Sequence, residues 1–142
     1  MKLLDYTGKL NEHNEYLEIL KKLEEKSKYI EIVLLDERES NDLINEFRND
    51  IVFTEKVSKW WGTETMSINN LYRIKASSKL FEYLRQFETF CKYYKSDKNY
   101  NCVHQVSTDF GIDDIAFYDD NKIPLLFTTT HECYITIRVD LK

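Results

Sequence analysis

The sequence predicts an α+β protein with one domain over residues 1–142, in which a mostly antiparallel sheet with a C-terminal three-stranded meander packs against two or three helices. Two observations predict this class. Helical apolar spacing occurs in several stretches before residue 95, whereas residues 112–141 consist of strand-like segments separated by turn residues. A chain of 142 residues is also long enough to bury a core without disulfides or metals.

The last strand of the meander has the clearest pattern. Apolar and polar residues alternate over residues 133–141, which buries one face of a strand and exposes the other. Residues 125–130 are rich in β-branched and large apolar side chains and predict the middle strand, and residues 115–118 predict the first. The Asp and Asn side chains of residues 119–121 between them favour a turn.

Helices are predicted in the first two thirds of the chain, where apolar residues recur every three to four positions. Each has a Ser or Asn that can cap its first turn. Their ranges and caps are 11–28 (Asn11), 40–49 (Ser40) and 77–95 (Ser77 or Ser78). The third helix has the longest apolar stripe, formed by Leu80, Leu84, Phe87, Cys91 and Tyr94.

Four further strands complete the prediction. Residues 29–35 become apolar on both faces, as is typical of an interior strand. Residues 51–61 predict a strand that ends at a turn around Gly62, and residues 70–76 predict the next. Residues 102–106 predict a short one.

Charge and composition limit the classes of function. The net charge is −5, with residues 1–50 and 101–142 acidic and residues 51–100 carrying five Asp or Glu against nine Lys or Arg. A generic nucleic-acid binder has the opposite balance, so nucleic acid is not the expected partner. No Gly-rich phosphate loop or metal-ligand spacing occurs, so we expect no cofactor and no metal. Three unpaired cysteines, and the lack of a signal-peptide region or an apolar run of about 20 residues, predict a cytoplasmic protein that does not enter a membrane.

One group of residues has side chains suited to catalysis. His131 and Glu132 follow the predicted middle strand, and Asp109, Asp113 and Asp114 lie upstream. A histidine with carboxylates can act in acid–base catalysis or bind a metal. The favoured interpretation is a turn histidine, because no catalytic motif surrounds it.

A thiol nucleophile is a second chemical alternative, because Cys133 lies two residues from His131. Alternate residues of a strand share one face, however, and Cys133 continues the apolar row of the last strand. We therefore interpret Cys133 as a core thiol.

Acidic and aromatic residues predict a protein-binding surface. Carboxylates that flank the first meander strand either shape its turns or meet a basic partner; they are Asp113, Asp114, Asp119 and Asp120. Trp61 and Tyr118 are candidate anchors, since Trp and Tyr are favoured at interfaces. One alternative places a half-buried Trp under the long predicted helix. Another lets the aromatic and basic residues of the central segment stack on nucleic acid.

The segment from Asp113 to Ile137, DDIAFYDDNKIPLLFTTTHECYITI, has three notable features. A strand runs into acidic turn residues, an apolar strand ends in Thr130, His131 and Glu132, and an alternating strand closes the segment. In these features it resembles the C-terminal part of small acidic bacterial immunity proteins, which partner polymorphic or contact-dependent growth-inhibition toxins. Cys133 stands where we expect glycine in that pattern. The resemblance implies a cytoplasmic protein that binds a cognate toxin domain and blocks it.

These observations predict a non-enzymatic, protein-binding inhibitor that occludes the active site of a cognate toxin domain. A nuclease is a natural target for an acidic inhibitor, because its active site is built to bind phosphate. Two alternatives stay open: a small hydrolase-type enzyme that uses His131 and carboxylates, and a regulatory or nucleic-acid-binding module.

Overall fold

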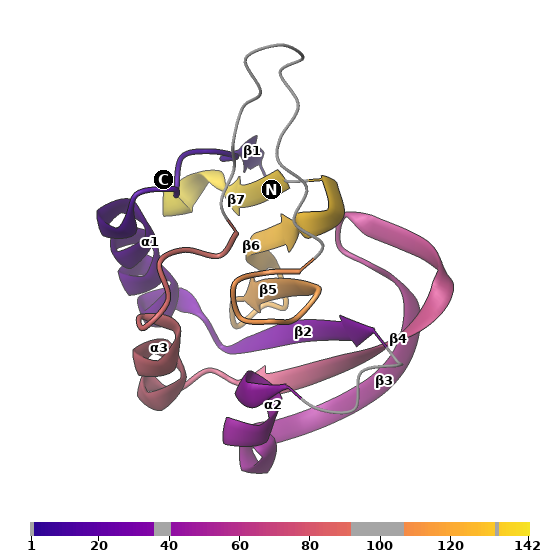
Figure 1. Ribbon diagram of the computed structural model, residues 1–142. Helices are drawn as coiled ribbons and strands as arrows, with labels where there is room; N and C mark the ends of the chain where they lie inside the picture. Colours follow the sequence, from indigo (N-terminus) through magenta and orange to yellow (C-terminus); the bar gives the residue numbers. More distant parts are fainter. Residues whose placement is uncertain (1, 36–40, 92–106, 133) are drawn as a thin grey trace.

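A seven-stranded sheet forms the frame of the protein in the computed structural model, which describes residues 2–35, 41–91, 107–132 and 134–142 (Figure 1). The strands lie in the order β1-β7-β6-β5-β2-β4-β3, and every neighbouring pair is antiparallel. Their bounds are β1 Leu3–Asp5, β2 Tyr29–Leu35, β3 Ile51–Trp60, β4 Thr63–Lys75, β5 Asp114–Tyr118, β6 Pro124–Thr129 and β7 Tyr134–Arg138. The predicted α+β class, with its single domain and antiparallel sheet, is confirmed.

Strands β2, β5 and β6 lie within one residue of their predicted ranges, whereas β7 differs. The meander β5-β6-β7 consists of neighbouring antiparallel strands, as expected from its sequence. Strand β2 is an interior strand between β4 and β5 and has the predicted bounds. The last strand is shorter than predicted, because β7 ends at Arg138 and the chain continues as a 3-10 turn over Val139–Leu141.

Helices cover one face of the sheet (Figure 1). The elements are α1 His13–Lys26, α2 Asp42–Glu46 and α3 Ser78–Leu84, with 3-10 turns η1 Arg48–Asp50, η2 Thr130–Glu132 and η3 Val139–Leu141. Between them and the sheet lies the main core, to which β2 contributes Ile30, Ile32 and Leu34. The aromatic rings of Phe81 and Phe117 join α3 to β5 within this core.

Of the three predicted helix starts, the first is wrong, the second lies outside the described residues and the third is confirmed. Helix α1 begins after Glu12 rather than at Asn11, and the Glu12 side chain makes no capping hydrogen bond. Ser40 lies outside the described residues, and Asn41 caps α2 by accepting hydrogen bonds from two backbone N–H groups. Ser77 caps α3 as predicted.

The third predicted helix ends much earlier than Lys95. Helix α3 stops at Leu84, and the next hydrogen bonds, from Gln86 and Phe87, close tighter three-residue turns. The following irregular segment returns to the core, where the Thr89 hydroxyl donates to the Leu10 carbonyl oxygen. The apolar residues that follow Leu84 therefore reach the core from turns. Helical spacing in the sequence does not distinguish such turns from a continued helix. Residues 92–95 and the strand predicted at 102–106 lie outside the described residues.

The β3–β4 hairpin curls over the face of the sheet that the helices do not cover. Gly62, in the left-handed region at φ 78°, turns the chain between the paired residues Trp60 and Thr63. The tip then reaches β6, because a Cβ added at Gly62 would lie 2.3 Å from the Thr129 hydroxyl oxygen. Since β2 and β5 separate β4 from β6 in the sheet, the hairpin must arch across both. Figure 1 shows this bend on the right.

Candidate functional site

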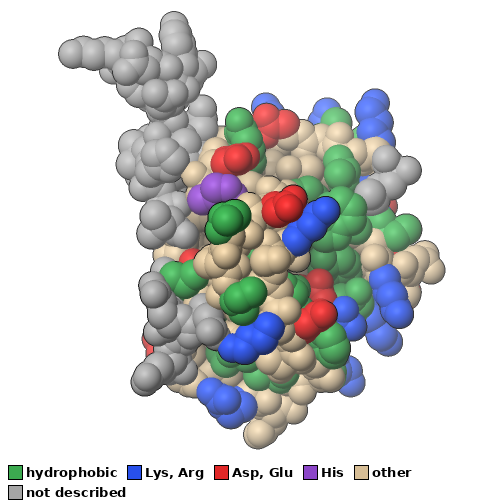
Figure 2. All heavy atoms as spheres, turned by 90° about the vertical axis from the view of Figure 1, so that its right-hand side faces the viewer, with side chains coloured by type: hydrophobic (Ala, Val, Ile, Leu, Met, Phe, Trp, Pro, Cys, Tyr) green, Lys and Arg blue, Asp and Glu red, His purple; other side chains and the backbone are tan. Residues whose placement is uncertain are grey.

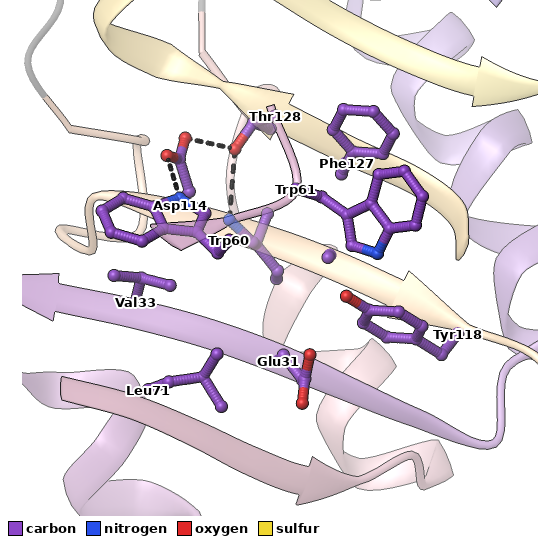
Figure 3. A pocket seen from close by; sticks show the side chains of 11 residues that line it. Glu31, Val33, Trp60, Trp61, Leu71, Asp114, Tyr118, Phe127 and Thr128 are labelled. Carbon is purple, nitrogen blue, oxygen red and sulfur yellow. Dashed lines mark hydrogen bonds between the residues drawn. The ribbon is translucent and has the colours of Figure 1, made fainter. Parts of the chain in front are cut away.

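The arch of the β3–β4 hairpin forms a groove on the sheet face opposite the helices. Its volume is about 490 Å³, and it is lined by Glu31, Glu55, Val57, Lys59, Trp60, Trp61, Gly62, Leu71 and Tyr118. A smaller cavity beneath it adds Val33, Asp114 and Phe127 to the wall (Figure 3). The size and the mostly apolar, aromatic lining are typical of a ligand or peptide site.

Asp114 anchors the hairpin to the sheet. The residue is 4% exposed, and its carboxylate accepts a hydrogen bond from Trp60 Nε1 at 2.8 Å through Oδ2. Its Oδ1 accepts from the Thr128 hydroxyl at 2.9 Å and from the Thr130 backbone N–H and hydroxyl at 2.8 and 2.9 Å. A buried carboxylate needs such donors, so Asp114 has a structural role that fixes Trp60 in the groove wall.

Trp61 forms the mouth of the groove. It occupies the hairpin turn, and 42% of its surface is exposed. Its ring lies 5.6 Å from that of Phe127, and Figure 3 shows it between Phe127 and Tyr118. The alternative that placed a Trp under the long helix is therefore wrong, because Trp60 and Trp61 both line the groove on the opposite face.

Tyr118 closes the floor of the groove at the end of β5. Its ring stacks on Tyr29 with 4.9 Å between centroids and an interplanar angle of 16°. Burial, followed by the nearby Glu31 carboxylate, raises the pKa of Tyr118 above its ordinary value. The hydroxyl thus stays protonated and presents a hydrogen-bond donor toward Glu31.

The four carboxylates predicted as one acidic group lie at opposite ends of β5. Asp113 and Asp114 precede or begin the strand, and Asp113 Oδ2 accepts a hydrogen bond from the Leu35 N–H at 2.6 Å. Asp119 follows the strand and binds Arg138, with 2.5 Å between Oδ2 and the guanidinium. Burial opposes ionisation of Asp119, but hydrogen bonds from Arg138 and two backbone N–H groups outweigh it and lower its pKa. Asp120 alone of the four is exposed.

His131 lies in the turn η2 after β6, at a separate cavity. Its Nε2 is 3.7 Å from Glu132 Oε1, and both side chains are half exposed. A cavity of about 140 Å³ brings His131 together with Asp113 and Asp114, although these two carboxylates accept the hydrogen bonds described above. Among the described residues, no three His, Cys, Asp or Glu side chains are grouped so that they could hold a metal ion. Cys133 lies outside the residues described.

The basic residues of the central segment are divided between two environments. Lys56 and Lys59 lie on the edge strand β3, whereas Arg73 forms an ion pair with Glu31. Both the Nε and the terminal nitrogen of Arg73 donate to Glu31 Oε2, at 3.1 and 2.8 Å. The Arg73 guanidinium also lies 4.7 Å from the Tyr29 ring centre and 4.9 Å from that of Phe53.

Exposed apolar side chains concentrate on the hairpin. Seven large hydrophobic residues are exposed in the described part of the chain, and five belong to the hairpin: Val52, Phe53, Trp61, Met66 and Ile68. On the side of the molecule that carries the arch, Figure 2 shows hydrophobic surface interrupted by single basic and acidic side chains. Such a mixture is characteristic of the surfaces through which proteins bind one another.

Glu31 and Glu55 were not singled out from the sequence, although both line the groove. Glu31 alternates with apolar residues of β2. This pattern indicates only that its side chain lies on the face of the strand opposite the apolar row. Two tertiary features place Glu31 in the groove. It pairs with Arg73 on the neighbouring strand β4, and the hairpin arches over it.

The chain matches no protein-family model, and neither a curated protein nor a solved structure was found to be similar to it. Across the described ranges, none of the helices has the length and apolar character required to cross a bilayer.

Proposed function

We propose that this chain is a protein-binding inhibitor, specifically a cytoplasmic immunity protein that neutralises a cognate toxin domain by occluding its active site. The observation that carries the proposal is the β3–β4 hairpin, where exposed Val52, Phe53, Trp61, Met66 and Ile68 accompany an aromatic groove. Interfaces favour clustered aromatic and Met side chains. The hairpin is therefore the proposed contact surface, with Trp61 and Tyr118 among its residues.

Charge supports a basic partner. The protein carries −5 overall, and an acidic inhibitor approaches a basic domain faster because the opposite charges attract. Asp120 is exposed and belongs to the surface that a partner can reach, whereas buried Asp114 supports the surface from beneath. Asp113 and Asp119 shape the two ends of β5 between them.

The test uses the protein domain encoded by the gene next to that of this chain, which the proposal expects to be a toxin. We expect the full chain to bind that domain and block its activity in a purified assay and in cells. Trp61→Ala should weaken binding at least tenfold, as truncation of an interface Trp commonly does. Lys22→Ala on α1 serves as the control on the helix-covered side. Full protection by Trp61→Ala, or no binding by the unaltered chain, contradicts the proposal.

A second candidate function rests on the cavity shared by His131, Asp113 and Asp114. A histidine beside carboxylates can transfer protons in ester or phosphodiester hydrolysis. Turnover of such substrates by the unaltered chain that is lost in His131→Ala, with unchanged thermal stability, would favour this enzyme. Turnover that persists in His131→Ala would exclude it.

A further inference from the structure

The groove combines carboxylates with aromatic rings, which is the combination that binds organic cations. Glu31 and Glu55 line it together with Trp61 and Tyr118. In Figure 3 the Trp61 ring and the Tyr118 hydroxyl lie on the same side of the sheet as the Glu31 carboxylate. Aromatic faces attract cations through their quadrupole, most strongly for Trp, and a nearby carboxylate adds a charge-assisted hydrogen bond.

One guanidinium is already bound in this way on the same face. Arg73 pairs with Glu31 and lies over the rings of Tyr29 and Phe53, at 4.7 and 4.9 Å from their centres. Both hydrogen bonds reach Oε2 of Glu31, and the Tyr118 hydroxyl faces the same carboxylate. A carboxylate flanked by aromatic rings is thus an arginine site within this protein.

Glu55 provides a second carboxylate for such a site. It is exposed on β3 opposite Leu71, and within the described residues no ion pair or hydrogen bond joins its carboxylate to a donor. The one lysine in the groove lining, Lys59, lies opposite Glu64 in the strand register. Because Arg73 already pairs with Glu31, Glu55 is the carboxylate of the described lining that remains for a further cation.

We propose that this groove binds an arginine side chain of a basic protein partner. The guanidinium pairs with Glu55 and stacks on Trp61 at the mouth of the groove. Arginine fits better than lysine, because its planar guanidinium stacks on rings and binds a carboxylate through two parallel hydrogen bonds. The proposal rests on the proposed function in that it takes the partner to be a basic protein.

The test does not require that partner. A hexa-arginine peptide is titrated into the full chain at 150 mM salt, and binding is followed by tryptophan fluorescence, since both Trp residues line the groove. A hexa-citrulline peptide, which has nearly the same shape without the charge, is the matched probe. We expect saturable quenching by the arginine peptide and at least tenfold weaker binding of the citrulline peptide. Equal affinity for the two peptides overturns the proposal.

Two variants of equal charge separate the groove from general attraction to an acidic protein. Glu55→Gln should weaken binding of the arginine peptide about tenfold, whereas Glu18→Gln on the exposed side of α1 should leave it unchanged. Both residues are exposed, so neither substitution should unfold the chain, and thermal melting checks this. Equal weakening by the two variants means attraction by net charge alone and overturns the proposal.

The same variants distinguish this inference from the proposed function. If the chain blocks a toxin domain while Glu55→Gln binds that domain and the arginine peptide as tightly as the unaltered chain, the inhibitor function stands and the arginine site falls. If the arginine peptide binds and depends on Glu55 but no toxin domain is bound, the arginine site stands and the inhibitor function falls.

Discussion

The meander and the β3–β4 hairpin belong to one sheet but are stabilised by different forces. Every residue of β5 and β6 is buried, whereas no residue of β3 is fully buried. One face of the meander packs into the main core beneath the helices, and on the other face Ala116, Tyr118 and Phe127 form a second cluster under the arch. The hairpin is joined to the sheet by the β2–β4 ladder, and its arched part is fixed by the Trp60–Asp114 hydrogen bond and by the close approach of Gly62 to β6.

This difference distinguishes the residues that stabilise the fold from the residues that are exposed on the surface. Burial makes the meander intolerant of changes in side-chain volume. On the hairpin, apolar side chains such as Met66 and Ile68 point to solvent and contribute little to folding. Their exposure on the hairpin is the feature on which the proposed contact surface rests.

The largest effect is expected in the meander. Phe117 is fully buried and contacts the rings of Phe81 and Phe90, so Phe117→Ala should lower the free energy of unfolding by about 3–5 kcal/mol. Phe53→Ala on β3, where the ring is 41% exposed, should cost less than about 1 kcal/mol. Urea unfolding measures both. Similar losses in the two variants would contradict the distinction between the regions.

The anchor of the hairpin should be the next most sensitive point. Asp114→Asn can keep a carbonyl oxygen for Thr128 and Thr130 but turns an N–H donor toward the Trp60 N–H. We expect a loss of about 2 kcal/mol, the usual cost of an unsatisfied buried donor. Amide hydrogen exchange should accelerate over residues 51–75 and stay slow over 114–138. Uniform acceleration would show that Asp114 stabilises the whole sheet instead.

Trp60→Phe provides the control for that measurement, because it removes the indole N–H that would face the amide group introduced at position 114. The double variant should recover part of the loss seen in Asp114→Asn, as expected when two residues interact directly.

A smaller loss is expected where the hairpin turn meets β6. In Gly62→Ala the residue must keep φ near 78°, which costs an L-residue about 1–2 kcal/mol, and its Cβ overlaps the Thr129 hydroxyl oxygen at 2.3 Å. Thermal unfolding measures the loss. Adding Thr129→Ala removes the overlap, so the double variant should be more stable than Gly62→Ala alone. If it is not, the tip does not contact β6.

The smallest effect concerns ion pairs at the C-terminal end of the sheet. A hydrogen bond from Arg138 lowers the pKa of Asp140 from 3.8 to about 2, and the pKa of Asp119 is lowered too. Because these pKa values are depressed on folding, the stabilisation is present above about pH 4 and is lost as the pH falls toward 2. Asp140 is 44% exposed, so solvent screening keeps its share below about 1 kcal/mol.

Urea midpoints between pH 5 and pH 2.5 measure this dependence. Arg138→Gln should flatten it. The exposed β3 carboxylate variant Glu55→Gln should leave it unchanged, since β3 lies at the opposite edge of the sheet from β7 and Arg138. An unchanged profile in Arg138→Gln would refute the assignment.

The sequence predicted the regions in which burial controls the pattern. Strand β2 and the meander are rich in apolar residues because the helix layer covers one face of these strands and the hairpin arch covers part of the other. The first half of β4 was missed because its pattern is inverted: Thr63, Thr65, Ser67 and Asn69 line the concave side, while Met66 and Ile68 face solvent. Apolar alternation cannot reveal a strand whose inner face is polar.

The candidate site was predicted only in part. Trp61 and Tyr118 were named as partner-binding residues, and the structure brings both to one groove. The four aspartates were grouped because they are near in sequence, yet a strand of five residues separates the two pairs. Glu55 and Glu31 join the groove through strand pairing and the arch, which are tertiary features. Their binding roles stay predictions.

The Trp60–Asp114 hydrogen bond joins residues 54 positions apart, and it spans the whole width from an edge strand to the sheet centre. Contacts so distant along the chain form slowly, because the intervening chain must first be ordered. We therefore expect the arch to close after the local strand pairs of the meander have formed. Since both tryptophans report on that closure, their fluorescence should reach its native value more slowly than the amide protons of β5 and β6 gain protection from exchange.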